Sequence, residues 1–88
     1  MKKLSTAKMA RTIKTLRDEK DLTQEDLSVL TGINRTLIGR IEHERFIPSM
    51  PQLEALAGAL GFDITDIFVE DSETNSFIAL RSEALSEN

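Results

Sequence analysis

Residues 22–48, LTQEDLSVLTGINRTLIGRIEHERFIP, constrain the fold more than any other part of this chain, because they hold two helix starts separated by one short turn. Thr23 precedes an apolar-periodic segment and Asp26 follows at the third position after it, so each side chain can accept a bond from a free amide at a helix start. Gly32 supplies the positive φ that ends this helix, and Asn34 can cap the next one. Two helices joined by so short a connection cross steeply, which predicts a helix-turn-helix unit.

The second of these helices, at residues 35–43, has two different faces. At 100° per residue, Ile38 and Ile41 fall on one side, which predicts that this side faces the core. In the preceding helix, Leu27 and Leu30 also share one face. The opposite face of the second helix is short, polar and partly basic, and it carries Thr36, Arg40 and His43.

Arg35 stands at the N-terminal end of the second helix, where a helix that enters the DNA major groove first meets base edges. An arginine there can donate two parallel hydrogen bonds to guanine, and Thr36 offers both a hydroxyl and a methyl group to a base pair. Each such contact discriminates between bases by about 1 to 3 kcal/mol. The alternative is an ordinary solvated helix face, but the arrangement favours a reader of duplex DNA.

Several motifs agree in order and spacing with one known family. The runs TQEDL, TGINRTLIGRIE, PS and LEALAGALGFD resemble the phage-repressor-like helix-turn-helix family, also called the Xre or Cro/C1 type. The resemblance covers about residues 8–68. TQEDL and NRT-x-I-x-x-IE are also similar to the small controller proteins of restriction-modification systems. This resemblance implies an all-α, five-helix, lambda-repressor-like DNA-binding domain with its helix-turn-helix at helices 2 and 3.

The resemblance also implies roles for individual residues. Positions that match base-contacting residues of the family are Arg35, Thr36 and Arg40. Positions that match phosphate-contacting residues are Gln24, His43 and Arg45. Arg17 and Glu42 match a pair that forms a partly buried ion pair between the first and third helices.

Three departures from the family pattern bear on this transfer, and one of them is Ser28 at a position usually held by alanine. The family places glycine just after the reading helix, whereas Glu44 stands there, so a glutamate has to take a strained backbone or end the helix differently. Its charge also falls close to the expected position of DNA phosphates. Leu37 lies on the flank of the same helix, where it either touches a thymine methyl group or packs against the protein.

Charge is distributed unevenly along the chain. Residues 1–48 hold 10 Lys/Arg and 7 Asp/Glu, a net +3, while residues 49–88 hold 1 and 8, a net −7, which together give the overall −4. The cations therefore accompany the expected reading helix, as attraction to phosphate requires. The acidic half is expected to face away from DNA.

Length and composition exclude other classes. A chain of 88 residues forms one small domain without room for a separate ligand-binding domain. No cysteine is present, which fits a cytoplasmic protein and excludes thiolate metal sites. His43 is the single histidine, so we expect no metal and no other cofactor. No catalytic triad or phosphate loop can be assembled, so the chain is not expected to be an enzyme.

The remaining helices follow from the same signals. A first helix capped by Ser5 or Thr6 runs to about residue 20, and Met9, Ile13 and Leu16 form its buried stripe. A fourth helix begins after Ser49 and ends at Gly61, and Asp63 caps a short fifth helix. More apolar residues lie near that fifth helix than one short helix needs to pack against the domain. They either pair two protomers or close the monomer core, and they are Phe62, Ile64, Ile67 and Phe68.

We therefore divide the chain into a DNA-binding domain, residues 1–70, and an acidic tail, residues 71–88, which either supports dimerisation or partner binding or is a disordered end. The expected function is that of a sequence-specific transcriptional regulator, a repressor or autoregulatory controller. It would bind a near-palindromic double-stranded operator as a homodimer, with its reading helices about 34 Å apart. The alternative is a protein-interaction module, such as an antitoxin or anti-regulator, that uses the acidic half.

Overall fold

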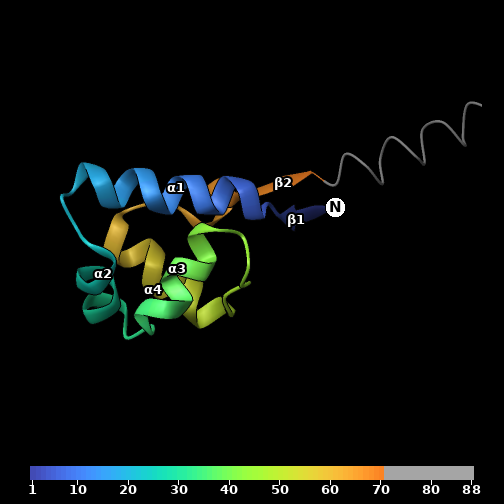
Figure 1. The fold of residues 1–88 in the computed structure, drawn as a ribbon. Helices are drawn as coiled ribbons and strands as arrows, with labels where there is room; N and C mark the ends of the chain where they lie inside the picture. Colours follow the sequence, from blue (N-terminus) through green and yellow to red (C-terminus); the bar gives the residue numbers. More distant parts are fainter. Residues whose placement is uncertain (71–88) are drawn as a thin grey trace, which may run out of the picture.

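The computed structural model of the protein describes residues 1–70 of the 88. Within that range it contains four α-helices, one 3₁₀ helix and a two-stranded antiparallel sheet (Figure 1). In chain order the elements are β1 (Lys2–Leu4), α1 (Thr6–Glu19), α2 (Gln24–Thr31), α3 (Arg35–Glu42), α4 (Met50–Leu60), the 3₁₀ helix η1 (Ile64–Ile67) and β2 (Phe68–Glu70).

The prediction of a fifth α-helix is wrong. Asp63 does cap a helical turn, because its carboxylate accepts a hydrogen bond from the N–H of Thr65, but only η1 follows before the chain becomes extended. Phe68 and Val69 carry aromatic and β-branched side chains, which suit a strand better than a helix end. They pair with β1, so the fold is mostly helical but not all-α.

The sheet joins the N-terminus to the far end of the described chain. Its register pairs Lys2 with Glu70, Lys3 with Val69 and Leu4 with Phe68. The N–H of Ser5 extends the pairing by donating to the carbonyl of Ile67 at 2.9 Å. Leu4 and Phe68 pack against the core, so the ribbon is anchored at its inner end and projects beside the start of α1 (Figure 1).

Local side-chain bonds set the helix starts. The predicted capping box of α2 is present, since the Thr23 hydroxyl accepts from the N–H of Asp26 at 3.0 Å and the Asp26 carboxylate accepts from the N–H of Thr23 at 2.9 Å. The hydrogen bond from the Thr23 backbone N–H to the Asp26 carboxylate, followed by one from the Thr23 side chain, lowers the pKa of Asp26 from its usual value. The backbone N–H and hydroxyl of Thr65 likewise lower the pKa of Asp63.

The other predicted helix boundaries agree with the structure. Ser5, Asn34 and Ser49 cap α1, α3 and α4, and each side chain accepts a bond from a backbone N–H in the first turn. Gly32 ends α2 at φ 76°, a left-handed conformation that glycine adopts without steric penalty. The helices of the helix-turn-helix unit therefore begin and end where hydrogen bonds between residues close in sequence, together with the glycine at the turn, allow it.

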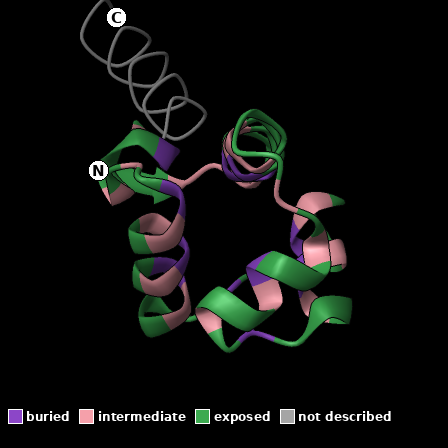
Figure 2. Ribbon diagram, turned by 90° about the vertical axis from the view of Figure 1, so that its left-hand side faces the viewer, coloured by how far each residue is buried: buried purple, intermediate pink, exposed green. Residues whose placement is uncertain are grey.

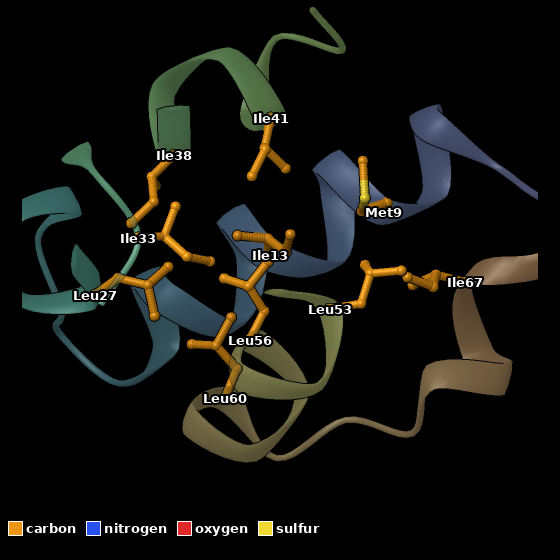
Figure 3. Packing of buried hydrophobic residues seen from close by; sticks show 10 residues of the cluster. All are labelled: Met9, Ile13, Leu27, Ile33, Ile38, Ile41, Leu53, Leu56, Leu60 and Ile67. Carbon is orange, nitrogen blue, oxygen red and sulfur yellow. The ribbon is translucent and has the colours of Figure 1, made fainter. Parts of the chain in front are cut away.

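All four α-helices and η1 contribute to one core. Figure 3 shows apolar side chains from these elements and from the turn between α2 and α3 pointing toward one another. The buried faces of the helices turn inward and their exposed faces outward (Figure 2). The core consists of Met9, Ile13, Leu27, Ile33, Ile38, Ile41, Leu53, Leu56, Leu60 and Ile67.

Leu30 departs from the predicted apolar face of α2. Leu27 is fully buried, but Leu30 is 59% exposed and Val29 is exposed beside it. Because each residue turns the helix by 100°, two residues three positions apart lie about 60° from each other around the helix axis. Because α2 lies at the edge of the domain, only one line of side chains along it reaches the core.

Within residues 1–70, no helix is both long and apolar enough to cross a lipid bilayer. Strand β2 ends at Glu70. The predicted tail at residues 71–88, and the dimer-supporting or partner-binding role considered for it, lie outside the described residues.

Candidate nucleic-acid interface

Helix α3 separates anchoring residues from exposed ones. Ile38 and Ile41 are completely buried in the core. Arg35, Thr36 and Arg40 are exposed on the other side of the helix. The three residues predicted to contact bases therefore form an accessible polar surface on a helix whose opposite face is fixed in the core.

An ion pair holds the end of α3 against α1. Arg17 Nε donates to Glu42 Oε2 at 2.8 Å, and Arg17 Nη2 donates to Glu42 Oε1 at 3.2 Å. The Glu42 side chain is 3% exposed and that of Arg17 is 13% exposed. Hydrogen bonding to Glu42 raises the pKa of Arg17 above its usual value. Arg17 also donates to the carbonyl of Leu22 at 2.8 Å, so one guanidinium connects α1, the α1–α2 turn and α3.

Gln24 participates in the same network. Its Nε2 donates to Glu42 Oε1 at 3.1 Å, which links the first residue of α2 to the last residue of α3. The side chain also lies over Gly39, where an added methyl group would meet Gln24 Oε1 at an ordinary contact distance of 3.8 Å. Gln24 is thus half-buried between the two helices, and its predicted phosphate contact stays a prediction.

Two side chains flank the exposed surface of α3. Arg35 Nε lies 3.9 Å from Glu25 Oε1 on α2, and both side chains are mostly exposed, so this ion pair is weak. Leu37 is half-buried and packs against the core. Of the two roles considered for Leu37, packing is the one that its position supports.

The chain after α3 forms a tight turn with a left-handed residue. Glu44 has φ 59°, the strained conformation expected when glycine is replaced at this position. Its N–H donates to the carbonyl of Ile41 at 3.1 Å, and the N–H of Arg45 donates to the carbonyl of Arg40 at 2.7 Å. These two bonds define a Schellman motif, which satisfies carbonyls at the end of a helix. A glutamate therefore occupies the position that glycine usually holds.

Thr6 holds the side chain of Glu44, a contact that sequence reasoning did not identify. The Thr6 hydroxyl donates to Glu44 Oε1 at 3.0 Å, which connects the turn after α3 to the first residue of α1. No local pattern signals a bond between residues this far apart in sequence. The carboxylate thus points to the start of α1.

The remaining predicted phosphate contacts border this turn. His43 and Arg45 are exposed. His43 Nδ1 lies 2.8 Å from the carbonyl of Gly39, so its ring folds back along α3. Among residues 1–70, no group of three or more His, Cys, Asp or Glu residues is placed to hold a metal ion.

The predicted dimerisation residues do not all lie on the surface. Ile67 is completely buried in the monomer core, which for this residue supports the alternative that it closes the core. As the last residue of η1, Ile67 closes the core against α1 and α4 in this small domain. Phe62, Ile64 and Phe68 are half-buried, and each also packs against the core.

Sequence comparison relates this chain to known regulators. Residues 13–67 match the sequence profile of the Helix-turn-helix family. The chain is 40% identical over 60 residues to the immunity repressor protein of Bacillus phage phi105, covering 68% of this chain and 42% of the repressor. It is 39% identical over 62 residues to an uncharacterized HTH-type transcriptional regulator of Methanothermobacter thermautotrophicus, covering 69% of this chain and 90% of that protein.

Solved structures with the same fold include restriction-modification controller proteins. C.AhdI from Aeromonas hydrophila superposes with a TM-score of 0.65 at 30% identity, covering 72% of this chain and 96% of C.AhdI. The C.Esp1396I tetramer, in complex with its natural 35-base-pair operator, superposes with a TM-score of 0.61 at 30% identity, covering 70% and 92%. The order and spacing of the motifs thus correspond to a shared three-dimensional arrangement.

Proposed function

We propose, because the chain belongs to the Helix-turn-helix family, that it is a DNA-binding transcriptional regulator that acts as a repressor or autoregulatory controller and not as an enzyme. The observation that carries this proposal is the division of α3: Ile38 and Ile41 are fully buried, while Arg35, Thr36 and Arg40 are exposed on its other side. A rigidly held helix with a polar, basic outer face suits insertion into the major groove.

Different residues serve affinity and sequence discrimination. Arg35 and Arg40 can each donate paired hydrogen bonds to guanine, and Thr36 can contact either a base edge or a thymine methyl group. Gln24, His43 and Arg45 lie at the ends of α2 and α3, where contacts to phosphates would fix the orientation of the protein on DNA without reading sequence.

The regulator acts as a homodimer in the cytoplasm, on a near-palindromic operator. Two copies related by a twofold axis place their α3 helices about 34 Å apart, one turn of DNA. Phe62, Ile64 and Phe68 are only half-buried in the monomer, which makes this region the candidate dimer surface. Family membership favours this function over the alternative of a protein-interaction module that uses the acidic half.

Selection of bound sequences from random duplexes tests the proposal, with affinity then measured across a range of salt concentrations. A defined consensus sequence and a steep loss of affinity with salt are expected, because phosphate contacts release counterions. Binding without sequence preference, or with little dependence on salt, would contradict the proposed function.

Two substitutions test the assignment of roles. Arg35→Ala should relax discrimination at one base pair of the consensus, by about 1 to 3 kcal/mol. Arg45→Ala should instead weaken binding to all duplexes alike and reduce the salt dependence. If both variants lose affinity uniformly, the division between base contact and phosphate contact is incorrect.

A further inference from the structure

The turn after α3 brings two arginines together. In a Schellman motif, the residue two positions beyond the helix cap packs against the residue three positions before it, and this contact is normally apolar. Here His43 is the cap, so the two positions are Arg45 and Arg40, which the 2.7 Å backbone bond joins directly. Both arginines are exposed. The motif therefore places two arginines at positions where apolar residues frequently meet.

Neither the charges nor the backbone of this turn favours its conformation. Two neighbouring guanidinium groups repel each other, and a left-handed residue other than glycine is unfavourable. Glu44 has that left-handed conformation. The bond from Thr6 to the Glu44 carboxylate is an interaction that favours the closed turn in addition to its two backbone bonds.

The position of this carboxylate adds to the effect. Helix α1 has no acidic residue in its own first turn, although an anion at a helix N-terminus is favourable. Glu44 supplies that negative charge from a distant part of the chain, through its contact with Thr6. The start of α1 thus holds the Glu44 side chain, and Glu44 in turn holds the backbone that places Arg45.

We propose that Glu44 is a positioning residue that, anchored by Thr6, keeps the turn after α3 closed so that Arg40 and Arg45 bind one phosphate of the DNA backbone together. A phosphate between two guanidinium groups removes their repulsion and accepts charge-assisted hydrogen bonds from both. This inference rests on the proposed function. It changes one assignment within that function, because Arg40 then contacts a phosphate shared with Arg45 instead of a base edge.

A double-mutant cycle on the selected duplex, at about 0.15 M ionic strength, tests the positioning role. Thr6→Val removes the hydroxyl with little change in side-chain shape, and we expect DNA binding to weaken by about 3- to 10-fold, as for the loss of one hydrogen bond. In the Arg45→Ala background the same substitution should change affinity by less than about 2-fold. Equal effects in both backgrounds would overturn the inference.

Salt dependence separates positioning from a purely structural role. If Arg45 leaves its phosphate, the magnitude of the slope of log affinity against log salt should fall by about 0.9 in Thr6→Val, as is also expected for Arg45→Ala. The matched control is Thr15→Val, an exposed threonine further along α1. It should leave both affinity and slope unchanged, and a slope for Thr6→Val equal to that of this control would overturn the inference.

An alanine substitution distinguishes positioning from repulsion. Glu44→Ala keeps the left-handed backbone strain of a residue other than glycine, and it removes both the negative charge and the anchor. We expect weaker DNA binding, by about 3- to 10-fold. Tighter binding would mean that the carboxylate repels DNA, which would overturn the inference while leaving the proposed function intact. If the random pool yields no bound consensus for the unmodified protein, the proposed function itself fails.

Discussion

Replacing Arg17 with methionine should reveal how strongly α3 depends on its attachment to α1. The substitution keeps much of the aliphatic stem but removes the two hydrogen bonds to Glu42 and the bond to the Leu22 carbonyl. Glu42, with 3% of its side chain exposed, would then be a buried carboxylate that has lost Arg17 and still accepts the hydrogen bond from Gln24 Nε2.

The expected loss can be compared with the stability of the whole domain. Removing one partner of a buried ion pair costs about 3 to 5 kcal/mol. A domain of this size has a free energy of unfolding of about 4 to 10 kcal/mol. The double variant Arg17→Met/Glu42→Leu also removes the unpaired carboxylate. The Leu22 carbonyl loses its partner in both variants, and the Gln24 amide loses its partner in the double variant alone, at about 1 kcal/mol. The double variant should therefore be more stable than Arg17→Met, by about 2 to 4 kcal/mol.

Urea unfolding followed by circular dichroism at 222 nm measures these differences, since the chain contains neither tryptophan nor tyrosine for fluorescence. The three proteins to compare are the unmodified chain, Arg17→Met and the double variant. A loss below about 1 kcal/mol in Arg17→Met would show that the pair behaves as an exposed one. A double variant less stable than Arg17→Met would refute the reasoning that the unpaired Glu42 carboxylate causes most of the loss in free energy of unfolding.

Three further results are expected. The lowered pKa values of Asp26 and Asp63 place the folded-state values below about 3.9, the unfolded value. The stability that these two carboxylates contribute is complete above about pH 4, and it is lost as the pH falls through their folded-state pKa values. Asp26→Asn should therefore reduce the loss of stability at acid pH. An unchanged loss of stability at acid pH would contradict this. Gly32→Ala should lower the free energy of unfolding by about 1 kcal/mol through backbone strain alone, because the added methyl group meets nothing within 4 Å; no loss in urea unfolding would contradict the left-handed assignment. Ile38→Ala should cost about 2 to 5 kcal/mol in thermal or urea unfolding, whereas Ile47→Ala, at a residue 66% exposed, should stay within about 0.5 kcal/mol; similar losses in the two would contradict the assigned core.

The parts of the fold that could be predicted from sequence depend on interactions between close neighbours. The capping residues Thr23, Asn34 and Ser49 bond to backbone groups in the first turn that follows them, so their signals are visible in the sequence. The burial of Ile38 and Ile41 follows from helical periodicity once the helix is located. The exposed face of α3 could be assigned for the same reason.

The parts that could not be predicted depend on distant residues. Strand β2 forms because Phe68 and Val69 meet β1, which lies at the other end of the described chain. The contact between Thr6 and Glu44 joins residues separated by 38 positions. The exposure of Leu30 is decided by where α2 sits at the edge of the domain, which its own periodicity does not report.

The pairing of β1 with β2 has a consequence for the order in which the protein assembles during synthesis. Lys2–Leu4 are synthesised before all four α-helices, whereas their partners Phe68–Glu70 are synthesised after them. Strand β1 therefore has no partner strand while the four α-helices are being synthesised. Closing the ribbon is a late step that can occur only when the domain has been translated to its end, so a nascent chain halted after α4 would lack it.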